Sequence, residues 1–228
     1  MAASDERCDR FEAPPRSARD FFDLARFPGG RGVRRGSAKL NLELALLADG
    51  VAPADVYPTL STEAGVRRAL AKFASIRLAI AWWSQPADAI AMLSDGRASM
   101  TTALNGDVFD AQVHGRAVGT IWDDQLDELD VFALPRDDPR HDLAMSFIRF
   151  ATGTAPLARV SEWLPYGPAR RSALPLVGDN PETGIRMLPY LPTAPANAAT
   201  AFAVDNLWWQ RHGSEIAPAW QDFLGRGS

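Results

Sequence analysis

Cysteine is nearly absent from this chain of 228 residues, which contains Cys8 alone. An intrachain disulfide needs two cysteines and a thiolate metal site needs several, so the sequence excludes both. Histidine is scarce as well. The three histidines, His114, His141 and His212, lie far apart in polar surroundings that are typical of surface or capping positions. We therefore expect no resident metal ion and no other cofactor.

Long apolar runs and dense basic patches are also missing. No run approaches the roughly 20 apolar residues that cross a bilayer. The net charge is -4, and the one basic cluster, "RGVRRG" at 31–36, is too short to follow a phosphate backbone, so no nucleic acid partner is expected. The opening "MAASDERCDRFEAPPRSARD" lacks the apolar core of a secretory signal. Taken literally, this start predicts a cytoplasmic protein.

Motifs for catalysis are equally poor. No G-x-S-x-G motif supports a nucleophilic serine. Gly30, Gly32 and Gly36 come near a dinucleotide fingerprint, but the last spacing is wrong and no convincing strand precedes them. The acidic residues at 123–130 lack the alternating spacing and central glycine of a calcium loop. The sequence favours binding over catalysis.

Between residues 20 and 124, apolar strands alternate with helices. "ARDFFDLARF" is typical of a short amphipathic helix, and "SAKLNLELALLADG" of a longer one, with Ser37 as its N-terminal cap and Gly50 at its end. Strands are expected at "GVRR", "RLAIAWW", "RASMTTAL" and "AVGTIW", and further helices at 63–76, "PADAIAMLSDG" and "GDVFDAQVHG". This order predicts an α/β layer with mainly parallel strands.

The sequence becomes helical after Pro135. "RHDLAMSFIRFATG" and "APLARVSEWL" predict helices, a Pro-rich loop covers 166–197, and a final helix holds Trp208, Trp209 and Trp220. The one strand expected in this last third is "VFALP", at its start. Because a lone strand offers little sheet to pack on, we expect apolar helix faces to remain uncovered here.

The stretch "QLDELDVFALP", residues 125–135, places carboxylates within an expected buried strand. Asp123, Asp124 and Asp127 fit a solvated loop. Asp130 has apolar neighbours on both sides, where an unpaired charge is costly. It needs either a hydrogen-bonded partner in the protein or a cationic ligand, and the residues alone favour neither.

Trp82 and Trp83 end an expected strand, which is where open α/β sheets bind ligands. Adjacent strand residues face opposite sides, so at most one of them can line a given cleft, and core packing is the favoured explanation for each. Asn105 and Gly106 also follow a strand directly and could begin the next helix, and a plain turn or cap explains them too. Indole faces with a carboxylate are suited to an ammonium group.

Taken in order, several segments resemble the periplasmic solute-binding proteins of ABC importers, in the spermidine/putrescine-binding group. They are "ARDFFDLARFPGGRGVRRG", "NLELALLADGVAPADVYPTLSTEAGVRRAL", "IAWWSQPADAIAMLSDGRASMTTALNG", "LDVFALPRDDP", "EWLPYGPARRSAL" and "VDNLWWQRHG". The resemblance implies a type II periplasmic-binding-protein-like α/β fold. Two lobes would close over a solute, and the partners would be the membrane permease subunits.

Site residues follow from the resemblance residue by residue. Asp130 matches a carboxylate that binds an amine, Tyr166 matches an aromatic of the same cleft, and Asn105 belongs to the opposite wall. Leu104 stands where polyamine binders carry an aromatic, and Ser37 and Leu40 stand where a carboxylate pair is expected. The expected solute is therefore a polyamine or another small amine-bearing organic molecule, and a long polycation such as spermidine fits less well. The candidate ligand-binding set is Asp130, Tyr166, Asn105, Trp83, Trp82, Ser37 and Glu128.

The resemblance also implies that roughly a hundred N-terminal residues and the export signal are absent. The expected organisation is a loose tail at 1–19, one complete lobe at 20–124, and a crossing strand with the mostly helical C-terminal part of the other lobe at 125–228. Localisation by resemblance is the periplasm. Two alternatives stay open: a two-lobed enzyme with Asp127 or Asp130 as general base, and a truncated fragment that binds nothing.

Overall fold

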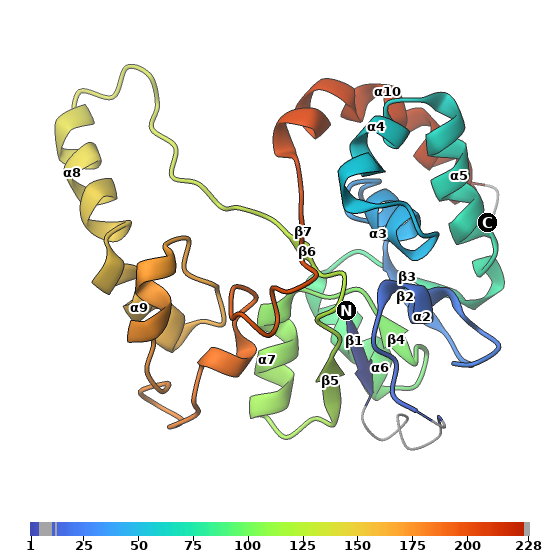
Figure 1. Cartoon of the computed structure of the whole chain (residues 1–228), viewed down its shortest axis with the longest axis horizontal. Helices are drawn as coiled ribbons and strands as arrows, with labels where there is room; N and C mark the ends of the chain where they lie inside the picture. The colour runs from blue at the N-terminus through green and yellow to red at the C-terminus, as the bar shows by residue number, and fades with distance from the viewer. Residues whose placement is uncertain (5–10, 12, 226–228) are drawn as a thin grey trace. The chain divides into compact units, whose positions relative to one another are not determined.

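The computed structural model describes residues 1–4, 11 and 13–225, which form two compact units (Figure 1). Unit 1 consists of Met1–Leu126 with Thr200–Ser228, and unit 2 of Asp127–Ala199. The first boundary lies close to the expected one at 124/125. The end of the chain differs, because it was expected with the second lobe and belongs to unit 1.

Unit 1 is built on a five-stranded sheet with the order β3-β2-β4-β1-β5. The strands are β1 (Ala2–Ser4), β2 (Arg31–Arg34), β3 (Ile80–Trp83), β4 (Met100–Thr101) and β5 (Val118–Thr120). Strand β2 is parallel to both β3 and β4, whereas β1 is antiparallel to β4 and β5. The α/β class with parallel strands is thus confirmed.

Helices cover both faces of this sheet, because its strands are apolar on both sides. They are α2 (Ala18–Phe22), α3 (Asn41–Ala48), α4 (Val56–Leu60), α5 (Glu63–Ala74), α6 (Pro86–Ser94), α7 (Asn105–Val113) and α10 (Asn206–Gly225), with 3-10 turns at Pro53–Asp55 and Arg77–Ala79. A large core joins α2, α3, α4, α5 and α10, and a smaller one lies under α6 and α7. Figure 1 shows α3, α4, α5 and α10 gathered together.

Two expectations about the first forty residues are corrected. Ala2–Ser4, expected in a loose tail, pairs as β1 with both β4 and β5, while residues 5–10 and 12 of that tail lie outside the described residues. Ser37 does not cap a helix, because α3 begins at Asn41 after Leu40. The Ser37 hydroxyl instead accepts a hydrogen bond from Lys39 N at 3.1 Å.

Helix α10 is not left uncovered, contrary to expectation. Trp208 and Trp220 are buried, and the Trp220 ring contacts Phe73 and Trp82 with centroid distances of 6.2 and 5.9 Å. The indole of Trp220 also donates a hydrogen bond to Arg35 O at 3.0 Å. The aromatic side chains of α10 therefore complete the core of unit 1.

Unit 2 contains α8 (His141–Ala151), α9 (Thr154–Trp163) and 3-10 turns at Arg171–Leu176 and Leu188–Tyr190. Its buried apolar residues are few and mostly small: Ala158, Ala173, Met187, Leu191 and Ala194. Polar side chains supplement this core, since Asn180 Nδ2 donates to Glu162 O and Asn197 Nδ2 to Leu191 O. Here the expected uncovered face is present, because α8 buries no residue.

The expected buried strand in 125–135 is mostly wrong. Only Leu126–Asp127 forms a strand, β6, which pairs with β7 (Phe202–Ala203). Leu129, Val131 and Phe132 are exposed. Their apolar composition is that of a buried strand, but among the described residues no neighbouring strand pairs with them. The composition therefore indicates a strand-forming segment, but it cannot show whether another strand lies beside it.

Arg31 organises the entry into β2 from within the core. Its side chain is fully buried, and its guanidinium donates to five oxygens: those of Phe21, Phe27, Gly29 and Gly30 and the hydroxyl of Ser99. Burial lowers the pKa of Arg31 to about 10, so the group remains charged at neutral pH. Because the planar fork satisfies several carbonyls at once, it fixes the loop before β2 against β4.

Glu43 anchors the segment that returns from unit 2. It is fully buried in α3 and accepts hydrogen bonds from Leu40 N at 2.8 Å, from the Tyr57 hydroxyl at 3.1 Å and from the Trp209 indole. The Tyr57 hydroxyl in turn accepts from Asp205 N at 2.7 Å, between β7 and α10. Burial raises the pKa of Glu43 despite these donors. A buried carboxyl group thus links α3, α4 and the start of α10.

Glu43→Gln should flatten the pH dependence of stability. The folded-state pKa lies above the ordinary value of 4.5, so folding stability is greatest below about pH 4.5 and falls as the pH rises through the raised pKa. The measurement is urea unfolding across this window. Glu63→Gln, at an exposed position, is the matched control. An unchanged pH slope in Glu43→Gln would contradict the assignment.

Gly65→Ala should destabilise unit 1, although alanine normally favours a helix. A Cβ at Gly65, in the first turn of α5, would lie 1.9 Å from Thr59 O, a backbone atom that cannot move aside cheaply. We expect a loss of roughly 1–3 kcal/mol in the free energy of unfolding, the usual cost of overpacking. Tryptophan fluorescence during urea unfolding measures it, because six of the seven tryptophans lie in unit 1.

Gly36→Ala is the control for this change. A Cβ at Gly36 meets nothing within 4 Å, so the variant should match the parent protein or gain slightly in stability. Equal stability of the two variants would show that α4 and α5 adjust freely around residue 65.

Candidate functional site

The carboxyl ends of β2, β3 and β4 meet at one edge of unit 1, because these strands are parallel. Ser37 follows β2, Trp83 ends β3, and Asn105 begins α7 after β4. Open α/β sheets bind ligands at this edge, where loops leave the strands and helices begin. Three of the expected residues therefore share one edge of unit 1.

Trp82 and Trp83 point to opposite faces of the sheet. The Trp82 ring packs on Trp220 and Phe223 of α10, in the large core. Trp83 is only 4% exposed and packs in the smaller core, with the Arg34 guanidinium 6.0 Å from its ring centroid. Its indole nitrogen is buried and finds no hydrogen-bond partner within the described part of the chain. The two indoles therefore pack in the cores on the two sides of β3, next to the carboxyl edge of the sheet.

Leu40 has a strained backbone at the same edge. Its φ of 73° lies in the left-handed region, which a leucine adopts at a cost of about 1–3 kcal/mol. Glu43 holds it there by accepting the hydrogen bond from Leu40 N. Strained residues often cluster at ligand sites, so the start of α3 is a candidate position at this edge. Sequence reasoning missed Glu43; the available signal was one acidic residue inside the apolar run "NLELALLA".

Asp107 adds an acid to the first turn of α7. Burial is the largest cause that raises its pKa, and the nearby Asp110 adds to it. One carboxylate oxygen of Asp107 is buried without a hydrogen-bond partner among the described residues. No sequence pattern distinguishes Asp107 from the other acidic residues at helix starts.

Two chain segments cross between the units, and on the unit 1 side they are tied together. The Thr200 hydroxyl donates to Asp123 Oδ1 and accepts from Asp124 N, both at 3.1 Å. Phe202 N donates to Gln125 O at 2.8 Å. Asp123 and Asp124, read from sequence as loop acids, thus take part in fixing the crossing point.

Unit 2 carries Glu128, Asp130 and Tyr166, all exposed. Asp130 makes no hydrogen bond or ion pair with any other residue that the structure describes. Of the two fates that the sequence left open, a partner within the protein is therefore not found. Tyr166 is 52% exposed, and its carbonyl oxygen accepts from the Ser161 hydroxyl at 2.7 Å, which fixes the "PYGP" turn on α9.

Asp127 lines a cavity of about 270 Å³ within unit 2, together with Arg170, Arg171 and Thr193. Burial raises the pKa of Asp127, which is half-buried. The Thr193 hydroxyl is buried there with no hydrogen-bond partner in the described residues. Acidic, basic and hydroxyl groups therefore surround this small space.

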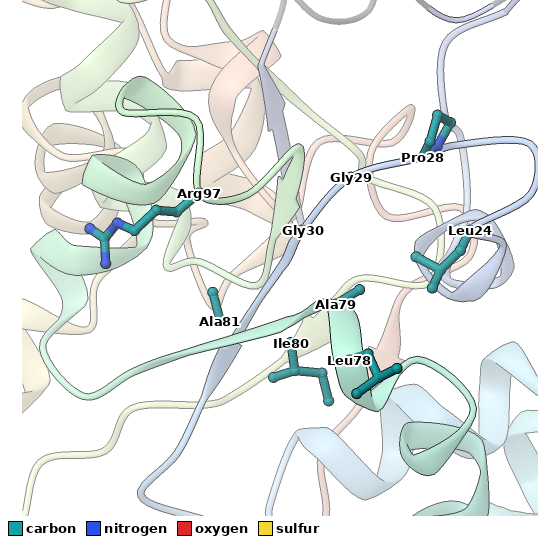
Figure 2. A pocket seen from close by; sticks show the side chains of 9 residues that line it. All are labelled: Leu24, Pro28, Gly29, Gly30, Leu78, Ala79, Ile80, Ala81 and Arg97. Atoms are coloured by element: carbon teal, nitrogen blue, oxygen red, sulfur yellow. The ribbon is translucent and has the colours of Figure 1, made fainter. Parts of the chain in front are cut away.

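The larger cavity, of about 540 Å³, lies at the opposite end of the unit 1 sheet, where β2 and β3 begin. Figure 2 shows its lining: Leu24, Pro28, Gly29, Gly30, Leu78, Ala79, Ile80, Ala81 and Arg97. Apart from Arg97 this lining is uncharged, and it contains none of the expected site residues. It offers no carboxylate to an amine.

The described residues contain neither a cluster of metal ligands nor a membrane-spanning helix. No group of three or more His, Cys, Asp or Glu side chains is arranged to hold a metal ion. None of the helices in residues 1–4, 11 and 13–225 is long and apolar enough to span a membrane.

Comparison with known proteins gives consistent results. A relative in Pseudomonas aeruginosa, named gamma-aminobutyric acid-binding protein, is 38% identical over 212 residues, which are 93% of this chain and 58% of the relative. An ABC transporter substrate-binding protein from Bradyrhizobium japonicum USDA 110 superposes with a TM-score of 0.83 at 29% identity, covering 98% of this chain and 66% of that one.

A third likeness is to the binding protein MotA of A. tumefaciens B6, solved in complex with glucopine. Its TM-score is 0.80 at 26% identity, over 97% of this chain and 67% of that protein. The chain thus spans about three fifths to two thirds of the length of these relatives. Residues 6–185 match the family described as bacterial extracellular solute-binding protein. The chain belongs to this family.

Proposed function

We propose that this chain acts as the solute-binding component of an ABC importer and holds a small, amine-bearing organic solute. Family membership supports the binding role, and the relative named for GABA and the ABC transporter neighbour from Bradyrhizobium support the solute class and the transport system. The partners would be the permease subunits, and the place of action the periplasm. The two-lobed enzyme is not favoured, because the family and these relatives are solute-binding proteins.

The main support for an amine-bearing solute is the carboxylate of Asp130. Its carboxylate is exposed, lacks a partner among the described residues, and lies between Leu129 and Val131 just after the chain enters unit 2. An ammonium group bound there would form a charge-assisted hydrogen bond. Glu128 is a second acid nearby in the chain, and the Tyr166 ring would cover the methylenes of the solute.

Unit 1 would contribute Asn105 and Ser37 to solute binding, with Trp82 and Trp83 as support. The N-terminal end of α7 favours a negative charge through the helix dipole, and Arg34, at the end of β2, adds a positive charge at the same edge. These groups suit a carboxylate rather than a second amine. The candidate site therefore fits a solute with an amine and a carboxylate, such as GABA, better than putrescine or spermidine.

Asp130→Asn should weaken binding of GABA by about 1.5–3 kcal/mol, the range for a hydrogen bond to a charged group, or roughly tenfold or more in Kd. Titration calorimetry of this chain with GABA, putrescine and spermidine measures it. Asp137→Asn, another exposed acid of unit 2, makes the same change in net charge and should leave Kd unaltered.

Three outcomes would count against the proposal. If none of the three amines binds, the chain is not an amine-binding component. If Asp130→Asn and Asp137→Asn bind equally well, Asp130 is not the amine anchor. If spermidine binds more tightly than GABA, the site is a polycation site and the carboxylate-binding wall is wrong.

A further inference from the structure

Arg34 is a cation without an anionic partner at the carboxyl edge of the unit 1 sheet. It is the last residue of β2, its side chain is exposed, and its guanidinium makes no hydrogen bond or ion pair with another residue in the described part of the chain. The guanidinium lies over the Trp83 ring, 6.0 Å from the ring centroid. This cation–π contact limits the freedom of a long side chain while its N–H donors stay available.

Strand geometry places this guanidinium on the side of the sheet that α6 and α7 cover. Val33 packs in the large core, so its neighbour Arg34 faces the opposite side, where Trp83 packs in the smaller core. Helix α7 begins at the same edge of the sheet, and its N-terminal end favours a negative charge. The surroundings of Arg34 therefore suit an anion.

The Trp83 indole is a second donor that lacks an acceptor. Its nitrogen is buried, and among the described residues no hydrogen-bond partner is found for it. A buried N–H group without a partner is costly. An indole N–H and a guanidinium can donate hydrogen bonds but cannot accept them, whereas an ionised carboxylate only accepts. A carboxylate that reaches the guanidinium arrives beside the ring that carries this nitrogen.

The backbone carbonyl groups next to Arg34 are already occupied. The side-chain amide of Asn41, which is 2% exposed, donates to Arg34 O and to Ser37 O, both at 2.8 Å. The Trp220 indole donates to Arg35 O at 3.0 Å. An ammonium group would therefore find few free acceptors on this turn. The same hydrogen bonds hold the turn in place before a solute arrives, which lowers the ordering cost of binding.

We propose that Arg34 binds the carboxylate of the solute and selects an amino acid over a plain amine. The inference rests on the proposed function, because it assigns one end of the same solute. A guanidinium can bind a carboxylate through two parallel hydrogen bonds. A site built around such bonds rejects a ligand that lacks the matching group, because its own donors are then left unpaired. GABA has the carboxylate, whereas butylamine carries a methyl group in its place.

Arg35 provides the matched control. It is the next residue, it is also exposed, and it forms no ion pair in the described part of the chain. Its guanidinium makes no ring contact there, in contrast to that of Arg34 over Trp83. Because Arg34→Gln and Arg35→Gln change the net charge equally, a difference between them isolates the role of the position.

The test is titration calorimetry of this chain and both variants with GABA and with butylamine. Arg34→Gln should bind GABA at least about tenfold more weakly than the parent protein, and Arg35→Gln within about twofold of it. The parent should prefer GABA to butylamine, and Arg34→Gln should lose most of this preference. The urea midpoints of the parent and both variants should agree, because both arginines are exposed.

The outcomes separate this assignment from the proposed function. A parent protein that binds neither GABA nor butylamine contradicts the proposed function itself. If the parent binds GABA and the two variants behave alike, only the assignment of Arg34 is overturned. The assignment also fails if Arg34→Gln keeps the parent's preference for GABA, or if its urea midpoint alone falls, which would indicate a structural role. Displacement of GABA by inorganic phosphate would overturn it in favour of a site for anions in general.

Discussion

A parallel strand buries both of its faces, and this requirement determines how unit 1 is assembled. Trp82 and Trp83 are neighbours in β3, yet one packs on Trp220 and the other among the side chains of α6 and α7. Two helical layers are needed, and the second crossing of the chain supplies α10 to complete one of them. The loops with Ser37 and Asn105 leave the carboxyl edge of the strands that this packing holds in place.

The connection between units depends on the same layer. Glu43 lies in the interior of α3, and its acceptor oxygens reach Tyr57 and Trp209, which fix the chain on either side of Asp205. Thr200 with Asp123 and Asp124 ties the two crossing segments to each other. Breaking the ties to Glu43 would leave a buried carboxyl group without donors.

Local sequence patterns were sufficient for most of unit 1. The alternation of apolar strands with helices predicted β2 to β5 and α5 to α7, because each element there has its own periodicity and punctuation. The start of α3 was missed because it depends on a left-handed Leu40 held by Glu43, a contact that no propensity encodes. The packing of α10 on unit 1 depends on a distant return of the chain.

For the candidate site, the pattern identified the edge of the unit 1 sheet and the family resemblance identified Asp130 and Tyr166. Neither the pattern nor the resemblance could show that no strand pairs with 129–134 in the described structure, because pairing also depends on a second segment. Asp107 and Glu43 were missed because burial raises the pKa of both, and this burial arises only once the helices are packed.

The buried position of Arg31 restricts which substitutions this protein can accept at residue 31. Its guanidinium reaches carbonyls on the loop before β2 and the Ser99 hydroxyl beside β4 through a rigid, planar arrangement of donors. A lysine, which is a frequent exchange at surface positions, concentrates its three donors on one atom and could not span that set. Lysine should therefore not replace Arg31 without loss, although Arg31 is not one of the candidate site residues.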